Sequence, residues 1–70
     1  MKFVVVYERT ETGYSAYSPD MPGCIAAGET LDETETLMRD AIAMPLEGMR
    51  EDGEQVPEPS AVANYITVSA

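Results

Sequence analysis

Carboxylates are the most numerous side chains in this sequence that could do chemistry. The chain of 70 residues has 13 acidic side chains, 4 basic ones and no histidine. Without imidazole, it can form neither a Ser–His or Cys–His catalytic pair nor the usual zinc site. A magnesium-dependent nuclease would need several carboxylates converging from different elements. Asp20 falls in a predicted loop, and three helical acids are spread around the predicted helix axis: Asp32, Glu35 and Asp40. We therefore expect no metal site.

Two further motifs resemble chemical sites but lack a necessary group. Cys24 is the single cysteine, which excludes an internal disulfide and fits a reducing cytoplasm. Nothing near it in the sequence would activate a thiol, so we predict a packed strand residue. The stretch from Gly23 to Thr30 imitates the P-loop spacing, but Glu29 replaces the phosphate-binding lysine and would repel phosphate. We expect no catalytic residue and no cofactor, and hence no enzyme.

A loop braced by prolines is the segment best suited to bind a partner. Pro19 and Pro22 stiffen it, so it can present side chains at low entropic cost. Met21 adds an adaptable apolar contact. The acids after Arg50 form a second candidate contact, for a basic partner. The predicted partner-binding residues are Ser18, Pro19, Asp20, Met21, Pro22, Gly23, Glu51 and Asp52. The alternatives are a plain connector for the loop and a solvated helix end for the acids.

Length and charge indicate one small domain, residues 1–70, that avoids nucleic acid and membranes. A chain of this size buries only about 60% of its unfolded surface. Its net charge of -9 disfavours phosphate backbones and anionic lipids and favours a basic protein, although the acids could serve solubility alone. The apolar run from Phe3 to Tyr7 is too short for a signal sequence or a membrane span. We expect a cytoplasmic protein.

Four segments are predicted to form β-strands. Lys2–Arg9 is rich in β-branched and aromatic residues and is apolar on both faces, which is typical of a central strand. The others are Tyr14–Ser18, Cys24–Gly28 and Tyr65–Val68. Gly13 precedes the second strand, in a turn where glycine is able to take a positive φ.

One long helix is predicted from Leu31 to Glu51. Thr30 and Glu33 have the spacing of a capping box, and Gly53 is the expected stop. The apolar stripe comprises Leu31, Thr34, Met38, Ala41, Ile42, Leu46 and Met49. Pro45 falls on this stripe and deletes one backbone hydrogen bond, so we predict a kink between Ala41 and Pro45.

These elements predict an α+β fold of order β-β-β-α-β with a mixed sheet. A right-handed crossover would place the last strand beside the first, so that the first strand is central. One helix covers only one face of the sheet. The other face needs a partner, so we expect self-association to a dimer or tetramer, or docking to another protein.

The segment from Gly13 to Ser60 closely resembles the HicB-like antitoxins. The resemblance lies in the order of a Tyr/Ser strand, a Ser-Pro-Asp-Met-Pro-Gly loop, a small-residue strand and an acidic-fronted helix. The helix then ends in Arg-Glu-Asp-Gly-Glu and a Pro-Glu-Pro exit, whereas the family more commonly has histidine at Pro45. The resemblance implies a partial RNase H-like fold.

The resemblance also implies a function and a partner. HicB-like proteins bind small HicA-type toxins that cleave mRNA, and they cover the toxin's catalytic histidine and RNA-binding surface. Many add a C-terminal DNA-binding module, but no basic segment follows the last predicted strand, so we expect no direct nucleic-acid binding. The alternative is a stand-alone oligomeric binding or regulatory domain without a toxin partner.

Overall fold

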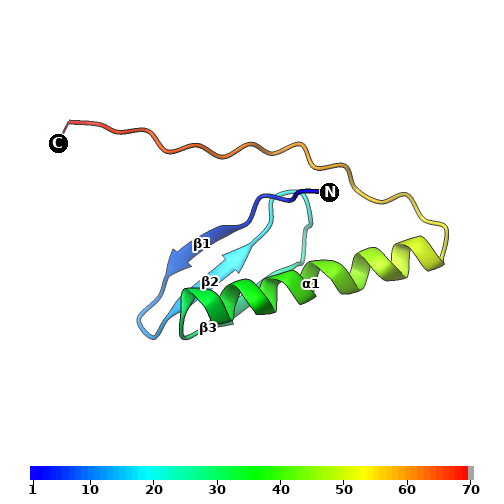
Figure 1. The fold of residues 1–70 in the computed structure, drawn as a ribbon, viewed down its shortest axis with the longest axis horizontal. Helices are drawn as coiled ribbons and strands as arrows, with labels where there is room; N and C mark the ends of the chain where they lie inside the picture. The colour runs from blue at the N-terminus through cyan, green and yellow to red at the C-terminus, as the bar shows by residue number, and fades with distance from the viewer. Residues whose placement is uncertain (70) are drawn as a thin grey trace.

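A computed structural model describes residues 1–69 as a small sheet followed by one helix and an extended tail (Figure 1). The strands are β1 (Val6–Arg9), β2 (Tyr14–Tyr17) and β3 (Ile25–Gly28), and the helix is α1 (Leu31–Glu51). The predicted α+β class and the β-β-β-α order are confirmed.

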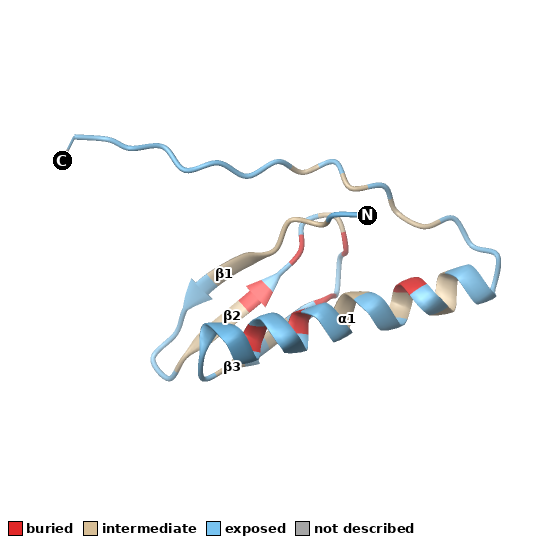
Figure 2. Cartoon of the chain, in the orientation of Figure 1, coloured by how far each residue is buried: buried red, intermediate tan, exposed pale blue. Residues whose placement is uncertain are grey.

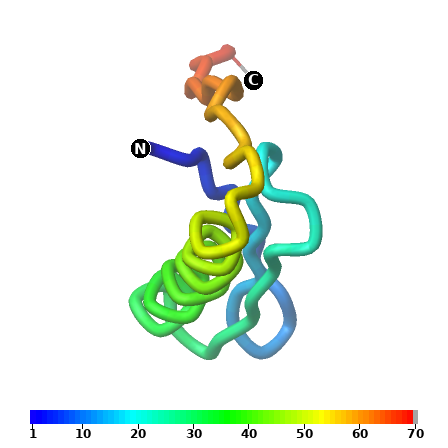
Figure 3. Tube along the Cα trace, turned by 90° about the vertical axis from the view of Figure 1, so that its right-hand side faces the viewer, coloured from blue at the N-terminus to red at the C-terminus, as the bar shows by residue number. Residues whose placement is uncertain are grey.

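The sheet is antiparallel with the order β1-β2-β3, so β2 is the central strand. Tyr7, Ala16 and Ala26 form one cross-strand row, and Ala16 is buried beneath the helix. α1 packs on β3 and β2, and the view in Figure 3 shows the helix on one side of the strands. Because side chains alternate along a strand, the row formed by Val6, Tyr17 and Ile25 faces the opposite side, which we call the open face.

The core lies between α1 and the sheet, where the buried segments of Figure 2 meet. Its buried apolar members are Ala16, Met21, Cys24, Met38 and Leu46. Partly buried side chains from the N-terminal segment pack against it, among them Phe3 and Val5. The free thiol of Cys24 is buried, as predicted.

Local capping signals set the bounds of α1. The Thr30 hydroxyl accepts a hydrogen bond from the Glu33 N–H at 3.1 Å, as the capping-box spacing predicts. At the other end Gly53 has φ +71, and the Glu54 N–H donates to the Met49 carbonyl at 2.8 Å. This glycine-centred closure satisfies carbonyls of the last turn, and the predicted stop is confirmed.

The predicted apolar stripe of α1 is largely confirmed. Thr34, Met38 and Leu46 are buried, whereas Leu31 in the first turn is 47% exposed. The Thr34 hydroxyl donates to the Thr30 carbonyl at 2.8 Å, so its burial leaves no polar atom unsatisfied. α1 continues unbroken through Pro45. The kink near Pro45 stays a prediction.

The predicted strand Tyr65–Val68 and the central position of the first strand are wrong for this structure. β1 starts at Val6 rather than Lys2 and lies at an edge of the sheet. Between Gly53 and Ser69 the chain forms neither helix nor strand. Instead of returning to β1, this segment is held near its middle by Asp20 and then runs out into solvent (Figure 1).

Gly13 is required for close backbone packing and not for a positive φ. Positive φ occurs at Gly23 and Gly53 among the described residues, and Gly13 is not one of them. A Cβ atom on Gly13 would lie 2.1 Å from the Gly28 carbonyl oxygen. The glycine therefore permits close approach of two backbone segments.

Candidate protein-binding surface

The loop between β2 and β3 is more firmly tied to the core than its sequence indicates. The Ser18 hydroxyl donates to the Val4 carbonyl at 2.8 Å, and Ser18 is buried. Met21 is only 3% exposed and belongs to the core. Both were predicted to contact a partner, and in this structure their side chains hold the loop against the rest of the domain.

Asp20 anchors the C-terminal tail. One carboxylate oxygen accepts the Ser60 and Ala61 N–H groups at 3.0 and 2.9 Å, and the other accepts the Ser60 hydroxyl at 3.0 Å. The hydrogen bonds from the Ala61 and Ser60 backbone, and then from the Ser60 hydroxyl, lower the pKa of Asp20 below its usual value, against the opposing effect of desolvation. The role of Asp20 is thus to join loop and tail.

An apolar patch remains exposed at this end of the sheet. Pro19 and Pro22 are exposed on the loop, and at its base Tyr17 and Ile25 pair directly across β2 and β3. Tyr17 is 43% and Ile25 71% exposed, on the open face. We call these four residues the loop patch. Sequence reasoning missed Tyr17 and Ile25, although their alternation with the small residues Ala16 and Ala26 was a usable signal.

The acidic helix end lies apart from this patch. Glu51 and Asp52 are exposed, and Asp52 is the C-cap residue of α1. Figure 1 shows the end of α1 projecting beyond the sheet, away from the β2–β3 loop. The predicted site residues therefore do not form one surface.

A groove of about 630 Å³ separates α1 from β1 and the residues that precede it. Its apolar lining comes from Phe3, Val5, Tyr7, Met38, Ile42 and Leu46. Burial raises the pKa of the Tyr7 phenol, and the nearby Glu35 carboxylate raises it further, while Arg39 lowers it. The groove exists because α1 lies over β2 and β3 and leaves the β1 side less covered.

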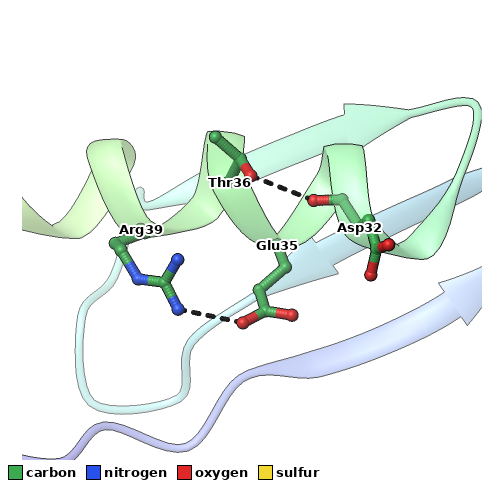
Figure 4. A network of polar contacts seen from close by, with 4 residues as sticks. All are labelled: Asp32, Glu35, Thr36 and Arg39. Atoms are coloured by element: carbon green, nitrogen blue, oxygen red, sulfur yellow. Dashed lines mark hydrogen bonds and ion pairs between the residues drawn. The ribbon is translucent and has the colours of Figure 1, made fainter.

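The helical acids considered as metal ligands take part in local contacts or face water. Glu35 pairs with Arg39 at 2.9 Å one turn along the helix, and the Asp32 carbonyl accepts the Thr36 hydroxyl (Figure 4). This exposed ion pair contributes little to stability. Over residues 1–69, no three acidic or cysteine side chains gather closely enough to hold a metal ion.

The described part of the chain also has no helix with the length and apolar character needed to span a membrane.

The chain is similar to known antitoxins in both sequence and structure. One chain of the solved HicA3 and HicB3 toxin-antitoxin complex matches with a TM-score of 0.66 and 27% identity, over 84% of this chain and 70% of that one. Antitoxin HicB 2 of Photorhabdus laumondii subsp. laumondii is 32% identical over 60 residues, and an uncharacterized 14.9 kDa protein of Haemophilus phage HP1 is 38% identical over 66.

These matches cover 86% and 94% of this chain but only 43% and 50% of the antitoxin and the phage protein, so the chain spans about half the length of these relatives. The family model for the HicB_like antitoxin of bacterial toxin-antitoxin systems matches residues 3–69. Nearly the whole described structure, including sheet, helix and tail, lies within that match. The chain belongs to the HicB-like antitoxin family.

Proposed function

We propose that this chain acts as an antitoxin that binds a small HicA-type mRNA-cleaving toxin and occludes it. The observation that carries the proposal is the structural match to a chain of the HicA3 and HicB3 toxin-antitoxin complex. An antitoxin family suggests a non-enzymatic regulator, so the function of this chain is binding. Its net charge of -9 supports a basic, RNA-binding partner.

The loop patch is the surface that we assign to the toxin. Its exposed members are apolar, and the prolines hold the loop in shape, so binding costs little conformational entropy. Met21 and Ser18 fix the loop from below through the core and the Val4 carbonyl. The patch is thus a preorganised apolar contact on an otherwise acidic molecule, which suits the centre of an interface.

The proposal also concerns the fold of the domain. We infer that the three strands and α1 form part of an RNase H-like arrangement, for which the β-β-β-α order is the support. A shared fold does not carry the chemistry of a nuclease, because the acids here lie in separate places.

The test is inhibition and binding of a HicA-type toxin from the same genome. The purified chain is titrated against toxin in an mRNA-cleavage assay, and affinity is measured by calorimetry. Ile25→Glu is expected to weaken binding roughly tenfold or more, because the new charge would be buried in the interface. Met44→Glu is the matched control, because Met44 on α1 is also 71% exposed and lies outside the loop patch.

Two outcomes would count against the proposal. Absence of binding and of inhibition would favour a stand-alone regulatory domain. Equal loss of binding in Ile25→Glu and Met44→Glu would keep the antitoxin function but remove the loop patch as its contact surface.

A further inference from the structure

We propose that two copies of this chain form an exchanged dimer, in which residues 62–68 of each copy add a strand to the outer edge of β1 of the other. This goes beyond toxin binding, because it concerns the protein alone. The tail supplies the first argument. Its apolar side chains are almost fully exposed, with Ile66 at 82% and Val68 at 73%. Such a segment is costly to leave in water.

The composition of the tail is that of a strand that pairs with another chain. Most of its residues are of types with high strand propensity, namely Val62, Tyr65, Ile66, Thr67 and Val68. No charged side chain occurs between Pro59 and Ala70, in a sequence that is 24% charged. Two molecules that each carry a net charge of -9 repel one another. This repulsion is smallest when the contact between them is made by an uncharged segment.

The path of the tail directs it away from its own domain. Asp20 holds Ser60 and Ala61 by three hydrogen bonds, and Pro57 and Pro59 stiffen the approach to that anchor. Beyond Ala61 every described residue is exposed. The extents of the molecule are 49 × 26 × 16 Å. In Figure 1 both α1 and the tail run along the longest axis, and the end of the tail extends past the sheet. A firmly anchored, outward-directed strand is well placed to reach a second molecule.

The site that would receive the tail is the open edge of β1 with the groove beside it. β1 is an edge strand, and an edge offers unpaired N–H and C=O groups for strand addition. Residues 3–9 and residues 62–68 have equal lengths, which at about 3.3 Å per residue span about 23 Å. An added strand would therefore extend along the whole N-terminal segment.

Alternation along the added strand places its side chains. Val62, Ile66 and Val68 share one face, which we place against the apolar groove beside Met38 and Ile42. Tyr65 then lies on the open face. Exchange between two copies is reciprocal, so one two-fold axis closes both edges and fills both grooves.

Light scattering of the full chain over a range of concentrations tests the dimer. The expected mass is twice the 7.6 kDa of the chain. Ile66→Glu is expected to raise the dimer dissociation constant roughly tenfold or more, because its charge would enter the apolar groove. Met44→Glu, with similar exposure on α1, is expected to leave the mass unchanged. Because Ile66 is 82% exposed, circular dichroism of α1 is expected to stay unchanged in the variant.

Isotope-filtered nuclear Overhauser spectroscopy on mixed labelled and unlabelled protein identifies the pairing. Contacts between Ile66 of one copy and Val5 or Tyr7 of the other are expected. A monomer at all concentrations, a dimer insensitive to Ile66→Glu, or the same contacts within one chain would each overturn the proposal. None of these results bears on toxin binding, which is measured separately through Ile25→Glu.

Discussion

At the scale of single residues, the structure assigns different roles to neighbours that look alike in the sequence. Asp20 and Met21 are adjacent in a loop expected to meet a partner. Met21 turns into the core, and Asp20 receives three hydrogen bonds from the tail. Both roles are decided by segments that lie far away along the chain: the core for Met21 and the tail for Asp20.

Acidification is expected to release the tail from Asp20. Hydrogen bonds to the carboxylate lower its pKa in the folded protein, so the anchor is fully formed above the usual carboxyl pKa and is lost as pH falls through the lowered value. The protection factors of the Ser60 and Ala61 amides are the intrinsic exchange rate at each pH divided by the rate that NMR measures. Between neutral pH and pH about 2.5, these protection factors are expected to fall at the acidic end.

Asp20→Asn is expected to abolish this pH dependence, because the amide does not titrate. Asp40→Asn on the exposed face of α1 is the control and is expected to leave exchange at Ser60 and Ala61 unchanged. A tail that exchanges equally fast in the wild type and in Asp20→Asn would contradict the anchoring role.

At the scale of elements, α1 and the strands obey different kinds of signal. The helix begins at a capping threonine and ends at a left-handed glycine, both visible in the sequence. The position of β1 in the sheet depends on which strand pairs with it, and no local sequence signal specifies that strand. The bounds of α1 were therefore predicted correctly, whereas β1 was misplaced within the sheet.

Replacing Pro45 in the middle of α1 is expected to stabilise the protein. Pro45→Ala restores a backbone hydrogen bond and removes a ring clash, and raises the free energy of unfolding by up to about 3 kcal/mol. Gly48→Ala is the control, because a Cβ there meets open space and gains only about 1 kcal/mol from helix propensity. Urea denaturation followed by circular dichroism measures both. A Pro45→Ala variant less stable than Gly48→Ala would show that the surroundings favour the proline.

At the scale of the whole molecule, the acids concentrate in one part of the chain and the tail carries no charge. Eight of the 13 acids lie between Asp32 and Glu54, on α1 and just after it. Apolar side chains are exposed in the loop patch and in the uncharged tail, and also on α1 at Leu31, Leu37 and Met44. This arrangement separates the two proposed associations. A basic toxin would be attracted by the whole charge, whereas a second copy would be repelled everywhere except at the tail.

Salt is therefore expected to act on these associations in opposite directions. Raising ionic strength from about 0.05 M to about 0.5 M should slow toxin association roughly tenfold or more, because screening removes electrostatic steering. The same change should strengthen the dimer, because screening removes the repulsion between two acidic molecules. Stopped-flow fluorescence measures the first and light scattering the second. A toxin association rate that does not respond to salt would exclude steering by the net charge.

Local signals alone are enough to place most of the secondary structure of this protein. Residues within a few positions of each other specify the caps of α1, its buried stripe and the β-strand character of three short segments. They also suffice for the family, since the order of loop, strand and acidic helix from Gly13 to Ser60 is a linear pattern. These features need no knowledge of distant contacts.

Contacts between distant residues decide the remainder. Met21 is buried because α1 and the N-terminal segment close over it, and Gly13 is needed because Gly28 passes near. Asp20, forty residues earlier than Ser60, holds the tail beside the loop between β2 and β3. The exposure of Tyr17 and Ile25 follows from the single face that one helix can cover. A linear pattern cannot specify such pairings, because each depends on which of several compatible surfaces the folded chain brings together.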